Sequence, residues 1–89
     1  MKHALDGIRV ADFTTMLNGP YLTLLLSDMG ADVIKVEPPD GDPWRVVAGG
    51  FMGVNRGKRS IVLDLKKPEA TGIIHRLISV SDVMVENAR

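Results

Sequence analysis

The sequence has 89 residues, of which 45% are hydrophobic and only 4% aromatic, so we expect one small domain, or part of one, with an aliphatic core. Lys and Arg together number 11, as do Asp and Glu, and the resulting zero net charge argues against a general nucleic-acid-binding protein, which needs a basic face. The sequence has no cysteine, no secretory signal and no run of about 18 apolar residues, so disulfides, thiolate chemistry and a membrane span are excluded and a soluble cytoplasmic protein is expected.

A strand and a helix are predicted first. Residues 8–13 are expected to form the strand. Asn18 or Gly19 is expected to cap a helix that runs to residue 29, with Pro20 in its first turn, where a missing N–H is tolerated. Apolar residues lie on nearly all sides of this helix, so we expect a sheet to cover one side and further protein another.

The second predicted strand comprises residues 32–37, which are rich in β-branched side chains. Gly30 precedes it and is expected to end the helix in a left-handed C-terminal cap, because glycine has no Cβ. Pro38 and Pro39 follow the strand and end it, because neither has a backbone donor.

A loop of about 20 residues is predicted from residue 38 to residue 57, and loops of this length in compact domains are usually functional or mobile. Its apolar residues, which include Trp44, are expected to pack on a ligand or on another part of the fold. A strand over residues 60–64, a helix that begins near Pro68 and a strand over residues 82–86 complete the chain. The order β-α-β-loop-β-α-β predicts an α/β fold with a parallel sheet.

Each predicted strand ends near an acidic residue, and ligands of open parallel sheets bind outside the carboxyl ends of the strands. These acids could bind a ribose, act as bases or cap turns: Asp12, Glu37, Asp64 and Glu86. A conventional dinucleotide or P-loop site is not supported, since the first βα turn has one glycine rather than three.

Five cations lie within twelve positions, namely Arg56, Lys58, Arg59, Lys66 and Lys67. They could bind a polyphosphorylated ligand, or they could belong to solvated loops. His3 and His75 are far apart in the sequence and have no cysteine partner, so no metal site is expected. No catalytic constellation is visible from residue types alone.

Six segments in order resemble the N-terminal portion of class III CoA-transferases, the carnitine dehydratase/bile-acid-inducible type that includes acyl-CoA racemases. They are residues 5–12 (LDGIRVAD), 19–20 (GP), 30–38 (GADVIKVEP), 55–66 (NRGKRSIVLDLK), 68–69 (PE) and 82–87 (DVMVEN). The resemblance implies that residues 1–89 form a Rossmann-like CoA-binding fragment of a larger enzyme. It also implies an interlocked homodimer and acyl-aspartyl intermediates, with the nucleophilic Asp beyond residue 89 and therefore no catalytic residue in this chain.

The resemblance implies contacts with coenzyme A or an acyl-CoA, without a metal, at eight positions: Asn18, Leu63, Asp64, Leu65, Lys66, Asn87, Ala88 and Arg89. Two positions depart from the pattern. Some members have Gln at the position of Leu17, which could hydrogen-bond an acyl-aspartyl group, and some have Arg at the position of Pro38, which could contact the nucleotide.

The expected activity is transfer of CoA between a CoA thioester and a small carboxylic acid, with the isolated fragment inactive. Two alternatives stay open. The loop over residues 38–57 is shorter than in many transferases, which leaves an acyl-CoA racemase possible, and a non-catalytic α/β fragment that serves assembly is the other. The sequence does not specify the acyl group.

Overall fold

The computed structural model describes residues 3–47 and 49–87. Its elements are β1 (Arg9–Asp12), α1 (Asn18–Asp28), β2 (Asp32–Glu37), the 3₁₀ helix η1 (Pro43–Val46), α2 (Gly50–Asn55), β3 (Arg59–Val62), α3 (Pro68–Ser79) and β4 (Val83–Val85). The strands form one sheet in the order β3-β2-β1-β4, and all neighbouring pairs are parallel. The predicted α/β fold with a parallel sheet is therefore confirmed.

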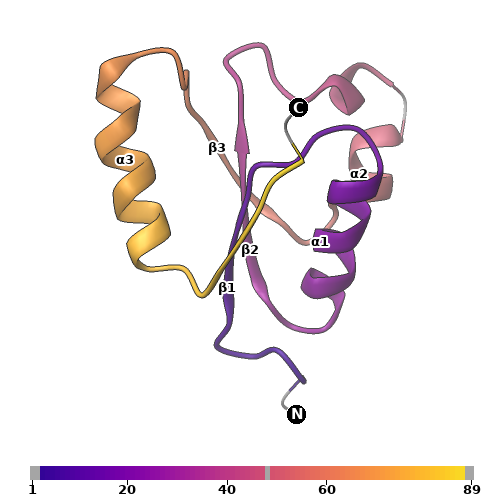
Figure 1. Ribbon diagram of the computed structural model, residues 1–89. Helices are drawn as coiled ribbons and strands as arrows, with labels where there is room; N and C mark the ends of the chain where they lie inside the picture. Colours follow the sequence, from indigo (N-terminus) through magenta and orange to yellow (C-terminus); the bar gives the residue numbers. More distant parts are fainter. Residues whose placement is uncertain (1–2, 48, 88–89) are drawn as a thin grey trace.

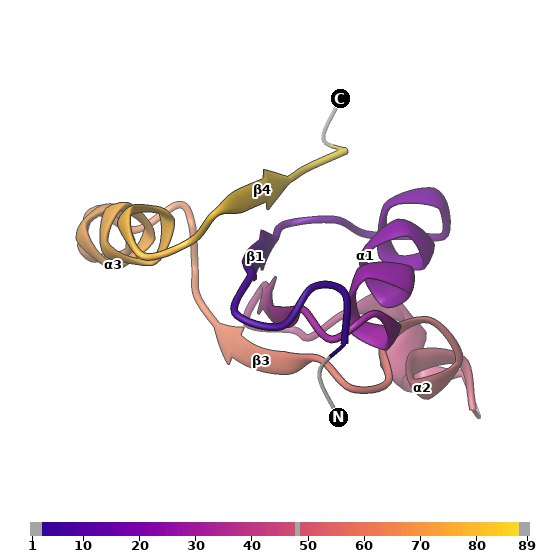
Figure 2. The ribbon, with the colours of Figure 1, turned by 90° about the horizontal axis from the view of Figure 1, so that it is seen from below.

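The helices lie on both faces of the sheet. Helices α1 and α2 cover one face, whereas α3 stands on the other, as the view along the strands shows (Figure 1, Figure 2). Because all four strands run in the same direction, their carboxyl ends meet at one edge of the sheet. The loops that follow β1, β2 and β3 therefore start beside one another at that edge.

The C-terminal end of α1 is formed as predicted. Gly30 has a φ of 103°, and its N–H donates to the carbonyl of Ser27 at 3.0 Å. The next N–H, of Ala31, donates to the carbonyl of Leu26 at 3.1 Å. This pair of bonds is the Schellman motif, which directs the chain from the helix into β2.

The predicted cap at the start of α1 is wrong. The N-cap residue is Leu17, and no side chain caps the helix there. Gly19 instead allows the start of α1 to lie close to Thr14, because a Cβ on Gly19 would be 2.4 Å from the Cβ of Thr14. Asn18 and Gly19 thus belong to the first turn of the helix.

The core lies between the sheet and α1. Val10, Ala31 and Val33 are buried there, and partly buried apolar residues from the N-terminal turn, α1 and β4 pack against them. The outer side of α1 is open, with Tyr21 53% and Met29 51% exposed. Within the described residues, the sheet therefore covers one side of α1 and the neighbouring α2 covers another.

The prediction of an irregular loop over residues 38–57 is wrong, because η1 and α2 lie within it. The start of η1 has a recognisable cap: an Asp42 carboxylate oxygen accepts from the N–H of Trp44 at 2.8 Å, and Pro43 occupies the first turn. Gly49, with a φ of 73°, precedes α2. Both helices are too short to be stable by themselves, so contacts with neighbouring segments must stabilise them. Helix α2 packs on α1 and on η1, and Arg45 of η1 pairs with Glu37 of β2.

Candidate ligand-binding site

A cavity of about 560 Å³ lies at the carboxyl edge of the sheet. This volume lies within the usual range for small-molecule sites, about 300–1,000 Å³. It is lined by residues from the ends of three strands and from the loops that follow them: Phe13, Thr15, Val36, Glu37, Pro38, Pro39, Asp40, Leu63, Asp64, Leu65 and Lys66. The location is the one at which open parallel sheets bind ligands.

The apolar wall of the cavity and the buried polar residues around Asp12 and Lys35 lie on opposite faces of the sheet. Successive side chains of a strand alternate between the two faces. Asp12 accepts a hydrogen bond from Thr23 of α1, so its side chain faces α1 and that of Phe13 faces the α3 side. Val36 likewise alternates with Lys35, which is buried among polar groups. The apolar wall of the cavity is therefore on the face that α3 approaches.

The structure brings four of the eight predicted contact residues together. Leu63, Asp64, Leu65 and Lys66 all line the cavity. Asn18 lies at the start of α1 and does not line it. Ala88 and Arg89 lie outside the described residues.

Asn87 lies next to the cavity rather than in its wall. Its amide oxygen accepts from the N–H of Thr15 at 3.1 Å, and its amide nitrogen donates to the carbonyl of Thr15 at 2.8 Å. Thr15 itself lines the cavity. Asn87 thus holds a residue of the cavity wall through a two-point contact.

Five lining residues were not among the site residues predicted from the sequence: Phe13, Thr15, Val36, Pro39 and Asp40. Phe13 and Val36 could have been found from strand alternation, because both are apolar and lie at strand ends. Thr15 carries no such signal, since its place depends on the path of the loop after β1.

The five clustered cations do not form one phosphate-binding patch. Arg56 pairs with Asp28 at 2.9 Å, and Arg59 pairs with Asp32 at 2.6 Å. Lys58 is buried. Of the five, only Lys66 lines the cavity, and its N–H donates to an Asp64 carboxylate oxygen at 3.0 Å. The turn-capping interpretation therefore fits Asp64.

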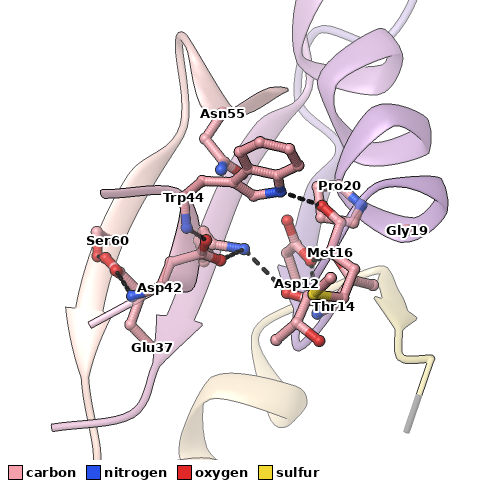
Figure 3. Close-up of polar contacts among 12 residues, drawn as sticks. Asp12, Thr14, Met16, Gly19, Pro20, Glu37, Asp42, Trp44, Asn55 and Ser60 are labelled. Carbon is pink, nitrogen blue, oxygen red and sulfur yellow. Dashed lines mark hydrogen bonds and ion pairs between the residues drawn. The ribbon is translucent and has the colours of Figure 1, made fainter. Parts of the chain in front are cut away.

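Asp12 lies at the centre of a buried polar cluster beside α1 (Figure 3). One of its oxygens accepts from the backbone N–H of Thr14 at 2.9 Å, and the other lies 3.0 Å from Lys58 Nζ. Burial raises the pKa of Asp12, but hydrogen bonds from Thr14 and Thr23 and the charge of Lys58 outweigh it, so that its pKa lies below the usual range. Burial also lowers the pKa of Lys58, and the attraction of Asp12 only partly offsets this effect. Asp12 is therefore a structural anion and not an available base.

Glu37 anchors the loop after β2. Arg45 donates two hydrogen bonds of 2.7 Å to its carboxylate, Ser60 donates a third, and the N–H of Asp42 donates a fourth at 2.9 Å. Hydrogen bonds from Arg45 hold the pKa of Glu37 at about 2, well below its usual 4.5, although burial opposes this shift. Its oxygens are engaged by the protein, which favours turn capping over ribose binding.

No group of three or more His, Asp or Glu side chains within residues 3–47 and 49–87 is placed to hold a metal ion. His3 and His75 are both exposed. The lining of the cavity itself, with apolar Phe13, Val36 and Leu63 and the cation Lys66, is suited to hold an apolar or aromatic group that carries negative charge at its margin.

Comparison with known proteins relates this site to a family. The family model described as CoA-transferase family III matches residues 5–89. The chain is 48% identical over 96 residues to a succinyl-CoA:mesaconate CoA-transferase of Haloarcula hispanica, a match that covers 94% of this chain and 24% of the relative. It is 47% identical to a formyl-CoA:oxalate CoA-transferase of Rhodopseudomonas palustris, with 98% of this chain and 23% of the relative covered.

A solved structure agrees with the sequence comparisons. The crystal structure of a CAIB/BAIF family protein from Brucella suis superposes with a TM-score of 0.94 at 38% identity, covering 99% of this chain and 26% of that one. The chain thus spans about a quarter of the length of the relatives that it matches. These matches run through β1 to β4 and include every residue that lines the cavity, and on this evidence the chain belongs to CoA-transferase family III.

Proposed function

We propose that this chain is the CoA-binding N-terminal part of an enzyme that transfers CoA between a CoA thioester and a small carboxylic acid. The observation that carries the proposal is the cavity at the carboxyl edge of the sheet, lined by the four consecutive residues Leu63, Asp64, Leu65 and Lys66. The relatives named above are transferases, which favours this activity over that of a racemase.

The chemistry of the lining suits the nucleotide end of CoA. Phe13, Val36 and Leu63 offer apolar surface for a flat ring. Lys66 supplies a point charge for a phosphate, and the Asp64 turn fixes the backbone that carries it. Asn18, Asn87, Ala88 and Arg89 complete the proposed contact set.

The catalytic nucleophile is proposed to lie outside residues 1–89. The buried acids of the described residues, Asp12, Glu37 and Asp42, are engaged in hydrogen bonds and ion pairs, which makes them poor candidates for an acyl-aspartyl intermediate. We further propose that the complete protein is a cytoplasmic, interlocked homodimer. Among the helices of the described residues, none has the length and apolar character that a membrane span needs.

Calorimetric titration with CoA and with 3′-dephospho-CoA tests the proposal. Lys66→Ala is expected to weaken CoA binding about five-fold, because one exposed charge-assisted contact contributes about 1 kcal/mol. Lys67→Ala is the matched control, since it removes an equal charge from the next residue, which does not line the cavity. Absence of binding at millimolar CoA, or equal effects of the two substitutions, would contradict the proposed site.

A further inference from the structure

The loop between β1 and α1 is held by side chains from three distant elements. Lys35 of β2 donates to the carbonyl of Thr14 at 2.9 Å. Asn87, which follows β4, binds both the N–H and the carbonyl of Thr15. The indole N–H of Trp44, in η1, donates to the carbonyl of Met16 (Figure 3). Three consecutive residues beside the cavity are thus fixed through their backbone groups.

Met16 is the strained member of this loop. Its φ is 69°, and it is the one residue other than glycine with a positive φ in the part of the chain that the structure describes. An L-residue other than glycine populates this left-handed conformation about ten-fold less than the right-handed one. The Met16 side chain is 61% exposed, so its own packing does not account for the conformation. The structure shows a hydrogen bond from the indole N–H of Trp44 to the backbone carbonyl of Met16.

The indole is itself held in place. The N–H of Trp44 donates to Asp42, and Asp42 pairs with buried Lys35 at 3.0 Å. The ring also lies close to Gly50, where a Cβ would be 2.7 Å from Trp44 Cε3. A fixed donor therefore faces the carbonyl of Met16 from a separate segment of the chain.

We propose that Trp44 is a positioning residue that holds Met16 in its left-handed conformation and so sets Thr15 in the wall of the cavity. Thr15 is adjacent to Met16 and lines the cavity, so a change in the Met16 backbone displaces it. The link to ligand affinity rests on the proposed function, because it takes the cavity to be the CoA site. The link to loop conformation does not depend on a ligand.

Trp44→Phe tests the proposal, because it keeps a ring and removes the N–H. Hydrogen exchange of the Thr15 amide, measured without ligand, is expected to accelerate about five-fold. The substitution removes the hydrogen bond from the indole to the Met16 carbonyl, and the loop then opens more readily and exposes the neighbouring Thr15 N–H. The dissociation constant for CoA is expected to rise by a similar factor. Val46→Ala is the control, since Val46 lies in the same short helix and is 90% exposed, and it should change neither quantity.

A second substitution separates positioning from packing. Asn adopts the left-handed conformation more readily than Met, so adding Met16→Asn to Trp44→Phe should restore slow exchange at Thr15 and the wild-type CoA affinity. Unchanged exchange in Trp44→Phe, or no recovery in the double variant, overturns the proposal.

Gly50→Ala provides an independent test if Trp44→Phe does not fold. The added methyl should displace the ring, and Trp44 is the sole tryptophan of the sequence, so its fluorescence should report the displacement. The Thr15 amide should then exchange faster than in the wild type. A change in Trp44 fluorescence without faster exchange at Thr15 counts against the proposal. If the wild-type chain does not bind CoA, the proposed function fails, whereas the exchange comparison still decides the role of Trp44.

Discussion

Replacing Glu37 by Gln should destabilise the chain in a manner that depends on pH. A pKa of about 2 in place of 4.5 corresponds to about 3 kcal/mol of stabilisation at neutral pH. Arg45, its main partner, is 47% exposed, and solvent screening reduces the expected loss to about 2 kcal/mol. Because the pKa of Glu37 is depressed on folding, this contribution is present above pH 4.5 and is lost as the pH falls toward 2.

The assay is urea unfolding of the wild type and of Glu37→Gln at several pH values between 7 and 2. The difference in unfolding free energy should be largest near neutral pH and should narrow between pH 4.5 and 2. Asp40→Asn is the matched control, since it removes the same charge from an exposed residue of the same loop, and it should change stability by less than about 0.5 kcal/mol. A difference for Glu37→Gln that is constant with pH would refute the assignment of the stabilisation to an ionised Glu37.

Two further substitutions test the buried contacts behind the cavity. Gly19→Ala places a Cβ 2.4 Å from the Cβ of Thr14, so urea unfolding should show a loss of about 1–3 kcal/mol; a neutral effect would mean that the two segments do not approach so closely. Lys58→Met leaves Asp12 buried without its cation and should cost about 3–5 kcal/mol, whereas restoration by a second change, Asp12→Asn, would show that the unpaired charge causes the loss. Failure of that second change to recover stability would indicate a packing role for Lys58 instead.

The sequence predicted regular elements well where local chemistry determines them. The bounds of β2 agree with the prediction for residues 32–37, because β-branched residues and the following prolines mark both ends. Gly30 marked the end of α1 for a similarly local reason, since its position requires a left-handed backbone. Residues 63–66 line the cavity because they follow a single strand, and their contact with CoA stays a prediction.

The loop after β2 could not be predicted in the same way. Its short helices depend on partners that are distant in sequence, such as the Arg45–Glu37 pair and the contact of Trp44 with Met16. The burial of Lys35 within a strand gave no local signal either, because its partner Asp42 belongs to that loop. The polar cluster behind the cavity is thus a property of the tertiary structure.

The central claim is that the carboxyl edge of this sheet binds CoA, and NMR chemical-shift mapping during a CoA titration tests it most directly. We expect the largest changes at the amides of residues 63–66, with further changes at Thr15 and Asp40, and smaller ones at the far edge of the sheet near Asp32. Saturable changes confined to the far edge, or none at millimolar CoA, would contradict the claim.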